Sequence, residues 1–224
     1  MNILEKIVGV IVRPLATFKG LCEEHERGER GFVRDAILVV IAHAILTSAG
    51  AYMALNKVEV VMPEEPVFRV VMAAIRVGTL FTSVVVVVAW LVLSLVVYAL
   101  ARLLGGGAGF VRTAILLAYA YIPALLLGIV SLALLIATPP VRIEVTSLQE
   151  LGAKMGQISR MARHLSWISL DVISWISMAW STALYVLAVR SAHGLSWPRS
   201  VVAGGLPGLA MMVLATLQYV LTPL

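Results

Sequence analysis

Five long apolar stretches dominate the chain, and each is near or above the length that crosses a bilayer. A transmembrane helix needs about 20 predominantly apolar residues at roughly 1.5 Å per residue. Helices are required because a backbone in lipid has to satisfy its own hydrogen bonds. The pattern therefore predicts an all-α polytopic membrane protein, a five-helix transmembrane bundle with spans at about 36–56, 77–101, 113–138, 166–189 and 200–223.

The first 35 residues form a different kind of segment, partly amphipathic and partly charged. Apolar residues recur at helical spacing over residues 1–21, and charged residues, Lys6 among them, lie off that stripe. We expect this N-terminal amphipathic helix to lie in the membrane interface. A helix packed on the rest of the protein is the alternative. The charged stretch 22–35 is predicted to be a solvated connector. The stripe consists of Leu4, Ile7, Ile11, Leu15 and Phe18.

A second amphipathic helix is predicted immediately before the fourth span. Residues 147–150 have the pattern of a capping box, in which a serine accepts an amide hydrogen bond and a glutamate reaches back. An apolar stripe follows at residues 148, 151, 155, 158 and 165. Another helix, at 67–76, is expected to run into the second span after the prolines at 63 and 66 break the chain.

Composition supports a membrane location and excludes an ordinary soluble domain. The 224 residues are 61% hydrophobic and only 13% charged, whereas soluble domains have roughly 25% charged residues. The mean hydropathy is +0.99. The net charge of +5 is interpreted as basic residues that flank the spans and meet anionic lipid, and no nucleic-acid partner is expected. The single cysteine, Cys22, excludes an intrachain disulfide.

The distribution of basic residues predicts the orientation of the chain. With five spans, ten of the 17 Lys and Arg residues fall on the side that holds the N-terminus and seven fall on the other. Cytoplasmic loops carry the excess of Lys and Arg. We therefore expect a multi-pass protein of the cell membrane with its N-terminus in the cytoplasm and its C-terminus outside.

Between the second and third predicted spans, the chain turns through a glycine cluster flanked by two arginines. Neither GxxxxGK[ST] nor a GxGxxG that follows a strand is present, so a phosphate-binding loop is disfavoured. A tight turn, in which glycine tolerates dihedral angles that other residues do not, is the preferred interpretation. The candidate residues are Arg102, Gly105, Gly106, Gly107, Gly109 and Arg112.

Two features in the later spans concern helix packing. Pro123 cannot donate an amide hydrogen bond to the Tyr119 carbonyl, so a kink is expected in the third span. Tyr119 and Tyr121 precede it, either in an aromatic belt at the interface or packed inside the bundle. Gly204 and Gly208 form a GxxxG pair that lets two helices approach closely, within this chain or in a homo-oligomer.

Few ionisable residues fall at membrane depth, where each costs about 3 kcal/mol or more. His43 lies in the first span and Asp171 at the start of the fourth. Together inside the bundle they would suggest a proton or cation route. The preferred interpretation places Asp171 at the interface and has His43 hydrogen-bonded to a carbonyl. No Ser/His/Asp, HExxH or paired-carboxylate motif is present, so we predict no catalytic residue, metal or cofactor.

With these elements assigned, the chain resembles the Yip1 domain family, in particular its short prokaryotic branch. The segments that carry the resemblance are Arg13–Phe18, Arg102–Phe110, Ala118–Pro123 and Gly194–Trp197. The resemblance covers the layout of the whole chain and implies one Yip1-like membrane domain over residues 1–224. Eukaryotic members have a longer cytoplasmic N-terminal region and act in membrane trafficking, and some bind small Rab-type GTPases. For prokaryotic members the resemblance implies a membrane location.

Two functional hypotheses follow. The first is a non-enzymatic membrane protein that organises membrane or recruits protein partners at its cytoplasmic face, by means of an interfacial helix and basic residues on anionic lipid. The alternative is a small transporter or channel subunit that uses the proline-kinked third and fifth spans together with His43 and Asp171. The expected partners are the lipid bilayer, proteins at the cytoplasmic face and a second copy of the chain.

Overall fold

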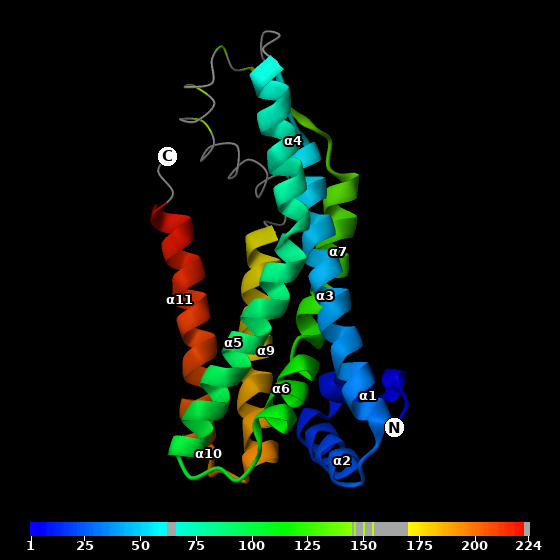
Figure 1. Cartoon of the computed structure of the whole chain (residues 1–224), viewed down its shortest axis with the longest axis vertical. Helices are drawn as coiled ribbons and strands as arrows, with labels where there is room; N and C mark the ends of the chain where they lie inside the picture. Colours follow the sequence, from blue (N-terminus) through cyan, green and yellow to red (C-terminus); the bar gives the residue numbers. More distant parts are fainter. Residues whose placement is uncertain (62–65, 145, 147–149, 151–153, 155–169, 222–224) are drawn as a thin grey trace.

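The computed structural model describes residues 1–61, 66–144, 146, 150, 154 and 170–221, which form a bundle of long helices (Figure 1). Five helical stretches in this part of the chain are long and apolar enough to cross a membrane, and they are Gly31–Asn56, Arg69–Leu103, Phe110–Ala137, Val172–His193 and Trp197–Leu217. The predicted five-span, all-α fold is therefore confirmed. The first two spans begin earlier than predicted because their helices continue through the charged residues at which an apolar pattern stops.

The first span is the single helix α3 (Arg30–Asn56), and the second is built from α4 (Pro66–Leu80) and α5 (Thr82–Leu103). As predicted, the segment 67–76 is helical and leads into the second span. The helix is interrupted at Phe81, between α4 and α5. There the Leu80 carbonyl accepts hydrogen bonds from the Ser83 hydroxyl at 2.9 Å and from the Ser48 hydroxyl of α3 at 3.4 Å, so the break is stabilised by side chains.

The third span is interrupted where Pro123 predicts a kink. Helix α6 (Phe110–Tyr119) ends, and α7 (Ile122–Ala137) begins with the proline in its first turn. The amides of Ala120 and Tyr121 bond to carbonyls three residues back, at 3.1 Å each. Pro123 has no amide hydrogen, so it cannot donate the next helical hydrogen bond, to the carbonyl four residues back. The result is two helices that meet at a tight turn.

The fourth span is α9 (Leu170–His193), and the fifth runs through α10 (Trp197–Ser200), the π-helical turn η1 (Val201–Gly205) and α11 (Leu206–Leu221). Pro207 follows the π-helical turn. Because a proline cannot donate the usual bond to the carbonyl four residues earlier, the wider turn before it has a local cause. A π-bulge of this kind is rare within helices.

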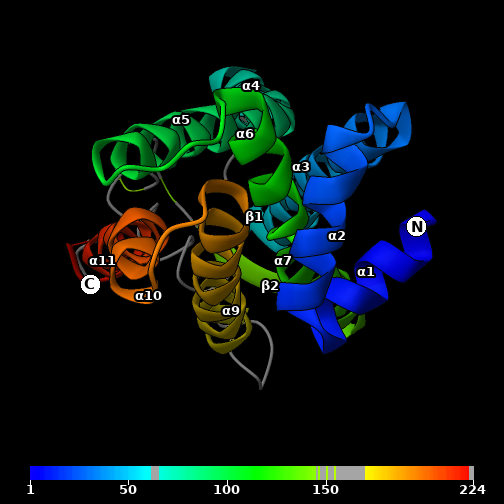
Figure 2. The same ribbon diagram turned by 90° about the horizontal axis from the view of Figure 1, so that it is seen from below.

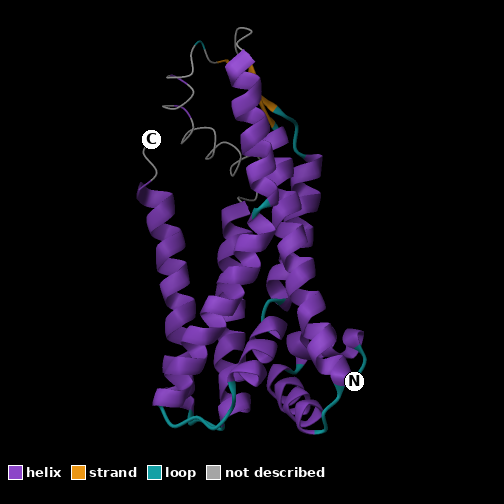
Figure 3. Cartoon of the chain, in the orientation of Figure 1, coloured by secondary structure: helices purple, strands orange, loops and turns teal. Residues whose placement is uncertain are grey.

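One pair of short strands was not predicted. β1 (Val58–Val61) and β2 (Val141–Glu144) pair in parallel, with Val58 opposite Val141. Both strands are rich in β-branched residues, which favour extended backbone. They lie at the end of the bundle away from α1 and α2 (Figure 3). Next to them, the Lys57 ammonium donates to the carbonyls of Ile136 and Thr138 at 3.0 and 2.6 Å. These bonds supply partners for carbonyl groups at the C-terminal end of α7.

The N-terminal region differs most from prediction. Arg13 and Pro14 divide the expected single helix into α1 (Ile3–Val12) and α2 (Pro14–Glu26). The predicted solvated connector 22–35 is wrong, because this stretch contains the end of α2, a short turn and the start of α3. Phe32 is completely buried in it. Several charged residues of this stretch, Glu24, Glu26 and Asp35 among them, form ion pairs.

The predicted helix before the fourth span falls largely outside the described residues. Of its capping box, the structure describes Glu150, whose carboxylate accepts hydrogen bonds from the amide and hydroxyl of Thr146 at 2.7 and 2.6 Å. The interaction with Lys154, at 2.7 Å, and then these bonds from Thr146 lower the pKa of Glu150 to about 2.

Helix α9 is central in the bundle and contacts α2, α6, α7 and α11. Seen from below, α1 and α2 lie on one side of α9, and α10 and α11 lie on the other (Figure 2). We call the end of the bundle formed by α1, α2, the turn 104–109 and the turn 194–196 the basic end. The buried core is concentrated here around α6, where residues 116–120 have no exposed surface.

Candidate functional site

Helix α1 presents one line of aliphatic residues outward and buries its lysine. Leu4, Val8 and Val12 lie along one line of the helix at four-residue spacing and are 69%, 56% and 66% exposed. On the other side, Lys6 is only 2% exposed and Val10 has no exposed surface. A line of exposed aliphatic residues opposite a buried lysine is not expected for a helix in water. The outward face therefore suits lipid.

The buried Lys6 lies at the centre of an ionic cluster. Its ammonium nitrogen is 2.8 Å from Glu24 Oε2 and 3.0 Å from Asp35 Oδ2, and all three side chains are almost fully buried. The second oxygen of Glu24 contacts the Met1 amino group at 2.8 Å, and the second oxygen of Asp35 contacts Arg34 at 3.2 Å. The cluster joins α1, α2 and α3 by ion pairs, in addition to their apolar packing.

The electrostatics of the cluster keep it ionised. Burial raises the pKa of Glu24, but the interactions with Lys6 and then with the Met1 amino group outweigh burial and hold that pKa below its ordinary value. Burial likewise lowers the pKa of Lys6, but hydrogen bonding to Glu24 and Asp35 reverses this effect and raises it. The charges are therefore mutually dependent, and removing one of them leaves the others without compensation.

Periodicity alone did not identify this cluster. The prediction placed Leu4 on one apolar stripe with Ile7 and Ile11 and placed Lys6 off that stripe. The structure exposes Leu4, packs Ile7 and Ile11 against the core and buries Lys6. The only sequence signal is that Asp35 directly precedes the apolar run of the first span. The two carboxylates that pair with the lysine are 18 and 29 positions away from it in sequence, beyond the reach of a helical pattern.

The glycine turn at the basic end is tight, but its glycines have different roles. Gly105 has a φ of +92°, a conformation that favours glycine. At Gly106 a β-carbon would lie 2.5 Å from His193 Nδ1 and 2.8 Å from the Ala101 carbonyl oxygen, so the need there is for space. At Gly107 and Gly109 φ is not positive, and an added β-carbon would meet no atom within 4 Å.

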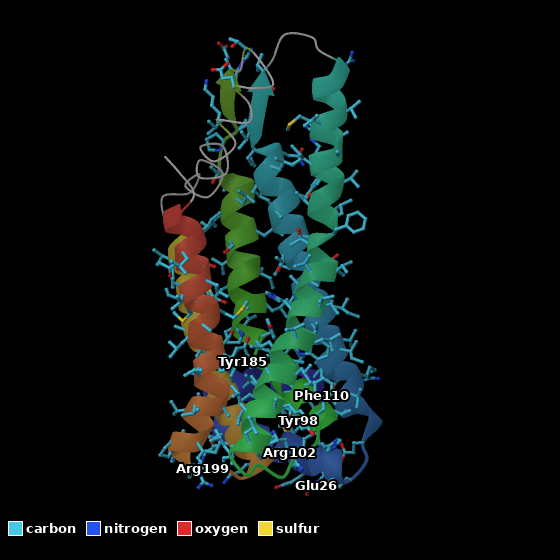
Figure 4. All side chains as sticks on the ribbon, turned by 60° about the vertical axis from the view of Figure 1, so that its left-hand side comes forward. Glu26, Tyr98, Arg102, Phe110, Tyr185 and Arg199 are labelled. Atoms are coloured by element: carbon cyan, nitrogen blue, oxygen red, sulfur yellow. The ribbon has the colours of Figure 1, made fainter. Side chains whose placement is uncertain are left out.

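The arginines around this turn stabilise helix ends. Arg102 donates to the Gly106 carbonyl at 3.1 Å, and Arg199 donates to the Leu104 carbonyl at 3.3 Å. Arg102 belongs to the last turn of α5, and the guanidinium of Arg199, from α10, reaches the carbonyl that follows it. Cations are favourable at such a helix C-terminus. Arg112 pairs with Glu26 of α2 at 3.0 Å. Figure 4 shows Glu26, Arg102 and Arg199 at the same end of the bundle, with Tyr185 further inside.

A buried histidine that the sequence analysis did not single out lies beneath the turn. His193 Nε2 is 2.9 Å from the Thr113 hydroxyl oxygen, and that hydroxyl contacts the Gly109 carbonyl at 3.0 Å. If the hydroxyl donates to the carbonyl, it accepts from a protonated Nε2, and Nδ1 is left facing Gly106. This contact locks the end of α9 against α6 and the glycine turn.

The two tyrosines before Pro123 have separate surroundings. Tyr119 is completely buried, and its hydroxyl donates to the Phe32 carbonyl at 3.2 Å. It is therefore a packing residue of the basic end, not part of an aromatic belt. Tyr121 lies on the far side of the helix break, 5.1 Å from the His43 ring and 6.1 Å from the Tyr185 ring, centroid to centroid.

These three rings lie at a cavity of about 760 Å³ in the other half of the bundle. Its walls come mainly from α3, α7 and α9, and α9 contributes Ser174, Ser177 and Ser181. Within the part of the chain that the structure describes, His43 Nδ1 and Ser181 Oγ are buried without a hydrogen-bond partner.

The structure does not bring His43 and Asp171 together. His43 lies beside Tyr121, which contacts Tyr185 of α9. Asp171 precedes Tyr185 by 14 residues in the same helix, which is about four turns or roughly 21 Å. The Asp171 side chain itself lies outside the described atoms. An ion route through a direct His–Asp contact therefore has no geometric support among the described residues.

The predicted GxxxG pair packs within the chain. A β-carbon at Gly204 would lie 2.7 Å from the Tyr185 carbonyl oxygen, and one at Gly208 would overlap the Thr182 side chain. Both contacts are to α9. The close approach that the two glycines permit is therefore used by η1 and α11 against α9.

The fold and these contacts define a multi-pass membrane protein with a largely helical bundle, two short N-terminal helices and two distinct polar regions. The Yip1 domain model matches residues 8–217. The chain therefore belongs to the Yip1 family, a multi-pass membrane family that is generally non-enzymatic. Neither a curated protein nor a solved structure gives a match.

Proposed function

We propose that this protein is a non-enzymatic organiser of the cytoplasmic leaflet, and that its basic end recruits partners there. The observation that carries the proposal is the inverted helix α1, which buries Lys6 and presents Leu4, Val8 and Val12 outward. Three exposed aliphatic residues on one line are suited to the boundary between headgroups and acyl chains. The buried ionic cluster fixes that orientation.

Charge at the same end supports the proposal. Arg13 and Lys19 are exposed, and neither side chain has a hydrogen bond or ion pair among the described residues. Cations placed next to an interfacial helix attract anionic lipid, with about 1 kcal/mol for each residue near the surface. Leaflet contact through α1 would leave the polar sides of α2 and the two turns facing the cytoplasm, where a protein partner could bind.

The position of α1 is tested by spin labelling. In a Cys22→Ser background, which has no other cysteine, a nitroxide at Val8→Cys should be accessible to oxygen and inaccessible to a water-soluble paramagnet. The matched label at Lys19→Cys, an exposed position of α2, should show the reverse. A water-accessible label at position 8 would contradict the proposal.

The lipid preference is tested by fluorescence quenching. Tryptophan emission in vesicles should be quenched more strongly when the anionic lipid, and not the zwitterionic one, carries bromine. Arg13→Gln with Lys19→Gln should reduce this preference. The control pair Arg69→Gln with Arg76→Gln removes two exposed arginines from α4, at the opposite end. An equal effect of both pairs would remove the basic end from the argument.

Transport through the bundle is the second candidate, and the cavity beside His43 is the observation that favours it. The separation between His43 and Asp171 weighs against the predicted pair. Asp171→Asn should abolish solute flux in proteoliposomes if that residue carries it, and unchanged flux would exclude the site.

A further inference from the structure

We infer that the cavity between α3, α7 and α9 is a binding site for an uncharged, single-chain amphiphile taken from the membrane. The site lies in the opposite half of the bundle from the basic end, and it is independent of the leaflet-organising role. Its volume of about 760 Å³ is within the range of roughly 300–1,000 Å³ that small-molecule sites occupy.

The walls of the cavity differ in polarity. The α9 wall carries hydroxyl groups at helical spacing, from Ser174 through Ser177 to Ser181. The facing walls of α3 and α7 are mainly aliphatic, with Leu46, Leu127 and other apolar residues. A ligand that fits both surfaces has hydrogen-bonding groups along one side and hydrocarbon along the other.

Two polar groups of the cavity lack internal partners among the described residues. His43 Nδ1 and Ser181 Oγ are buried and have no hydrogen bond within the described residues, and both side chains line the cavity. A buried polar group without a partner costs about 1–3 kcal/mol. A hydroxyl or carbonyl of a ligand in the cavity would supply the missing partner after a small side-chain rotation.

Charge restricts the ligand class. The described lining residues include no Asp, Glu, Lys or Arg, so an ionised headgroup would lose its hydration without gaining a counter-ion. A water filling would need about 25 molecules at roughly 30 Å³ each, against walls that are largely aliphatic. An uncharged lipid with a hydroxyl or ester head, such as a monoacylglycerol, meets both conditions.

A glycine keeps the cavity open. Gly50 of α3 lines it, has an ordinary φ, and would meet no atom within 4 Å if it carried a β-carbon. A side chain can therefore be built there into open space. Gly78 of α4 also has no neighbour within 4 Å but does not line the cavity. The two positions form a matched pair for filling the site.

The test is photolabelling of the full-length protein in vesicles with a diazirine monoacylglycerol. Labelled peptides should map to the cavity walls of α3 and α9, unlabelled monoacylglycerol should compete, and phosphatidylcholine should not. Gly50→Phe should reduce labelling about tenfold, which corresponds to 1.4 kcal/mol, and Gly78→Phe should leave it unchanged. Equal labelling of wild type and Gly50→Phe would overturn the proposal, as would labels confined to the outer surface.

Two further measurements keep the test decisive if Gly50→Phe does not fold. Ser181→Ala keeps the cavity and removes one unpartnered hydroxyl, so it should weaken labelling several-fold. A fatty-acid probe of the same chain length should label poorly because its carboxylate has no counter-ion. Rapid reaction of Ser177→Cys, in the Cys22→Ser background, with a membrane-impermeant thiol reagent would identify a water-filled path and refute amphiphile binding.

Discussion

Replacement of Lys6 by methionine is the most direct test of the ionic cluster that orients α1. Methionine keeps the length and apolar stem of the lysine but removes the charge that lies 2.8 and 3.0 Å from Glu24 and Asp35. Removing one member of a buried ion pair costs about 3–5 kcal/mol, because the remaining charge loses its compensation. Here Met1 and Arg34 still contact the outer carboxylate oxygens, so we expect the lower figure of about 3 kcal/mol.

The assay is thermal unfolding of the purified protein, followed by tryptophan fluorescence. For a chain of this size about 3 kcal/mol corresponds to a decrease of roughly 6–12 °C in unfolding temperature. Lys19→Met, at an exposed position of α2, should change it by about 1–2 °C or less, because such surface substitutions stay within roughly 0.5 kcal/mol.

The triple variant Lys6→Met, Glu24→Gln, Asp35→Asn separates charge from packing. Removing all three charges together avoids an uncompensated ion, and such replacements are often neutral or stabilising. The triple variant should therefore recover most of the stability that the single variant loses. If the two variants unfold at the same lowered temperature, the lysine acts through packing, and the electrostatic reasoning is refuted.

Two glycine pairs and the buried glutamate give three more expected outcomes. Gly106→Ala should cost about 1–3 kcal/mol in thermal unfolding, because the added carbon would overlap the histidine and a backbone carbonyl beneath it, while Gly107→Ala should be neutral. Because the pKa of Glu24 is lower in the folded protein than its unfolded value near 4.5, ionised Glu24 stabilises the fold above that pH, and this stabilisation is lost as pH falls through the folded pKa. The stability of wild type should therefore decrease more steeply on acid titration than that of Glu24→Gln. Gly204→Ala should destabilise the bundle, whereas Gly205→Ala, with its nearest contact at 3.4 Å, should be tolerated; dissociation of an oligomer with an unchanged unfolding temperature would instead place Gly204 between copies.

The parts of the fold that sequence could predict depend on local information. Span number follows from the length of apolar runs, because lipid imposes helix on any such run. The break in the third span follows from Pro123, since a missing amide hydrogen is a property of one residue. The tight turn at Gly105 is likewise local. Each of these features requires no knowledge of what the residue contacts.

The features that the sequence did not predict depend on contacts between distant segments. Lys6 is charged and therefore looks solvent-facing, and only the positions of Glu24 and Asp35 in the folded chain show why it is buried. The cavity is similar. The serines of α9 are visible in sequence, but the space in front of them exists because helices α3 and α7 do not fill it. No periodicity records an unfilled volume.

The break in the third span before Pro123 lies between the two polar regions, and the residues on its two sides belong to different regions. Tyr119, on one side of it, bonds to the Phe32 carbonyl and belongs to the core around the ionic cluster. Tyr121, on the other side, faces His43 in the cavity. Two residues of one span therefore contribute to two sites, because the helix ends between them. A variant that changes the cavity from α9 or α3 should leave the orientation of α1 intact, so the leaflet-organising and amphiphile-binding proposals can fail independently.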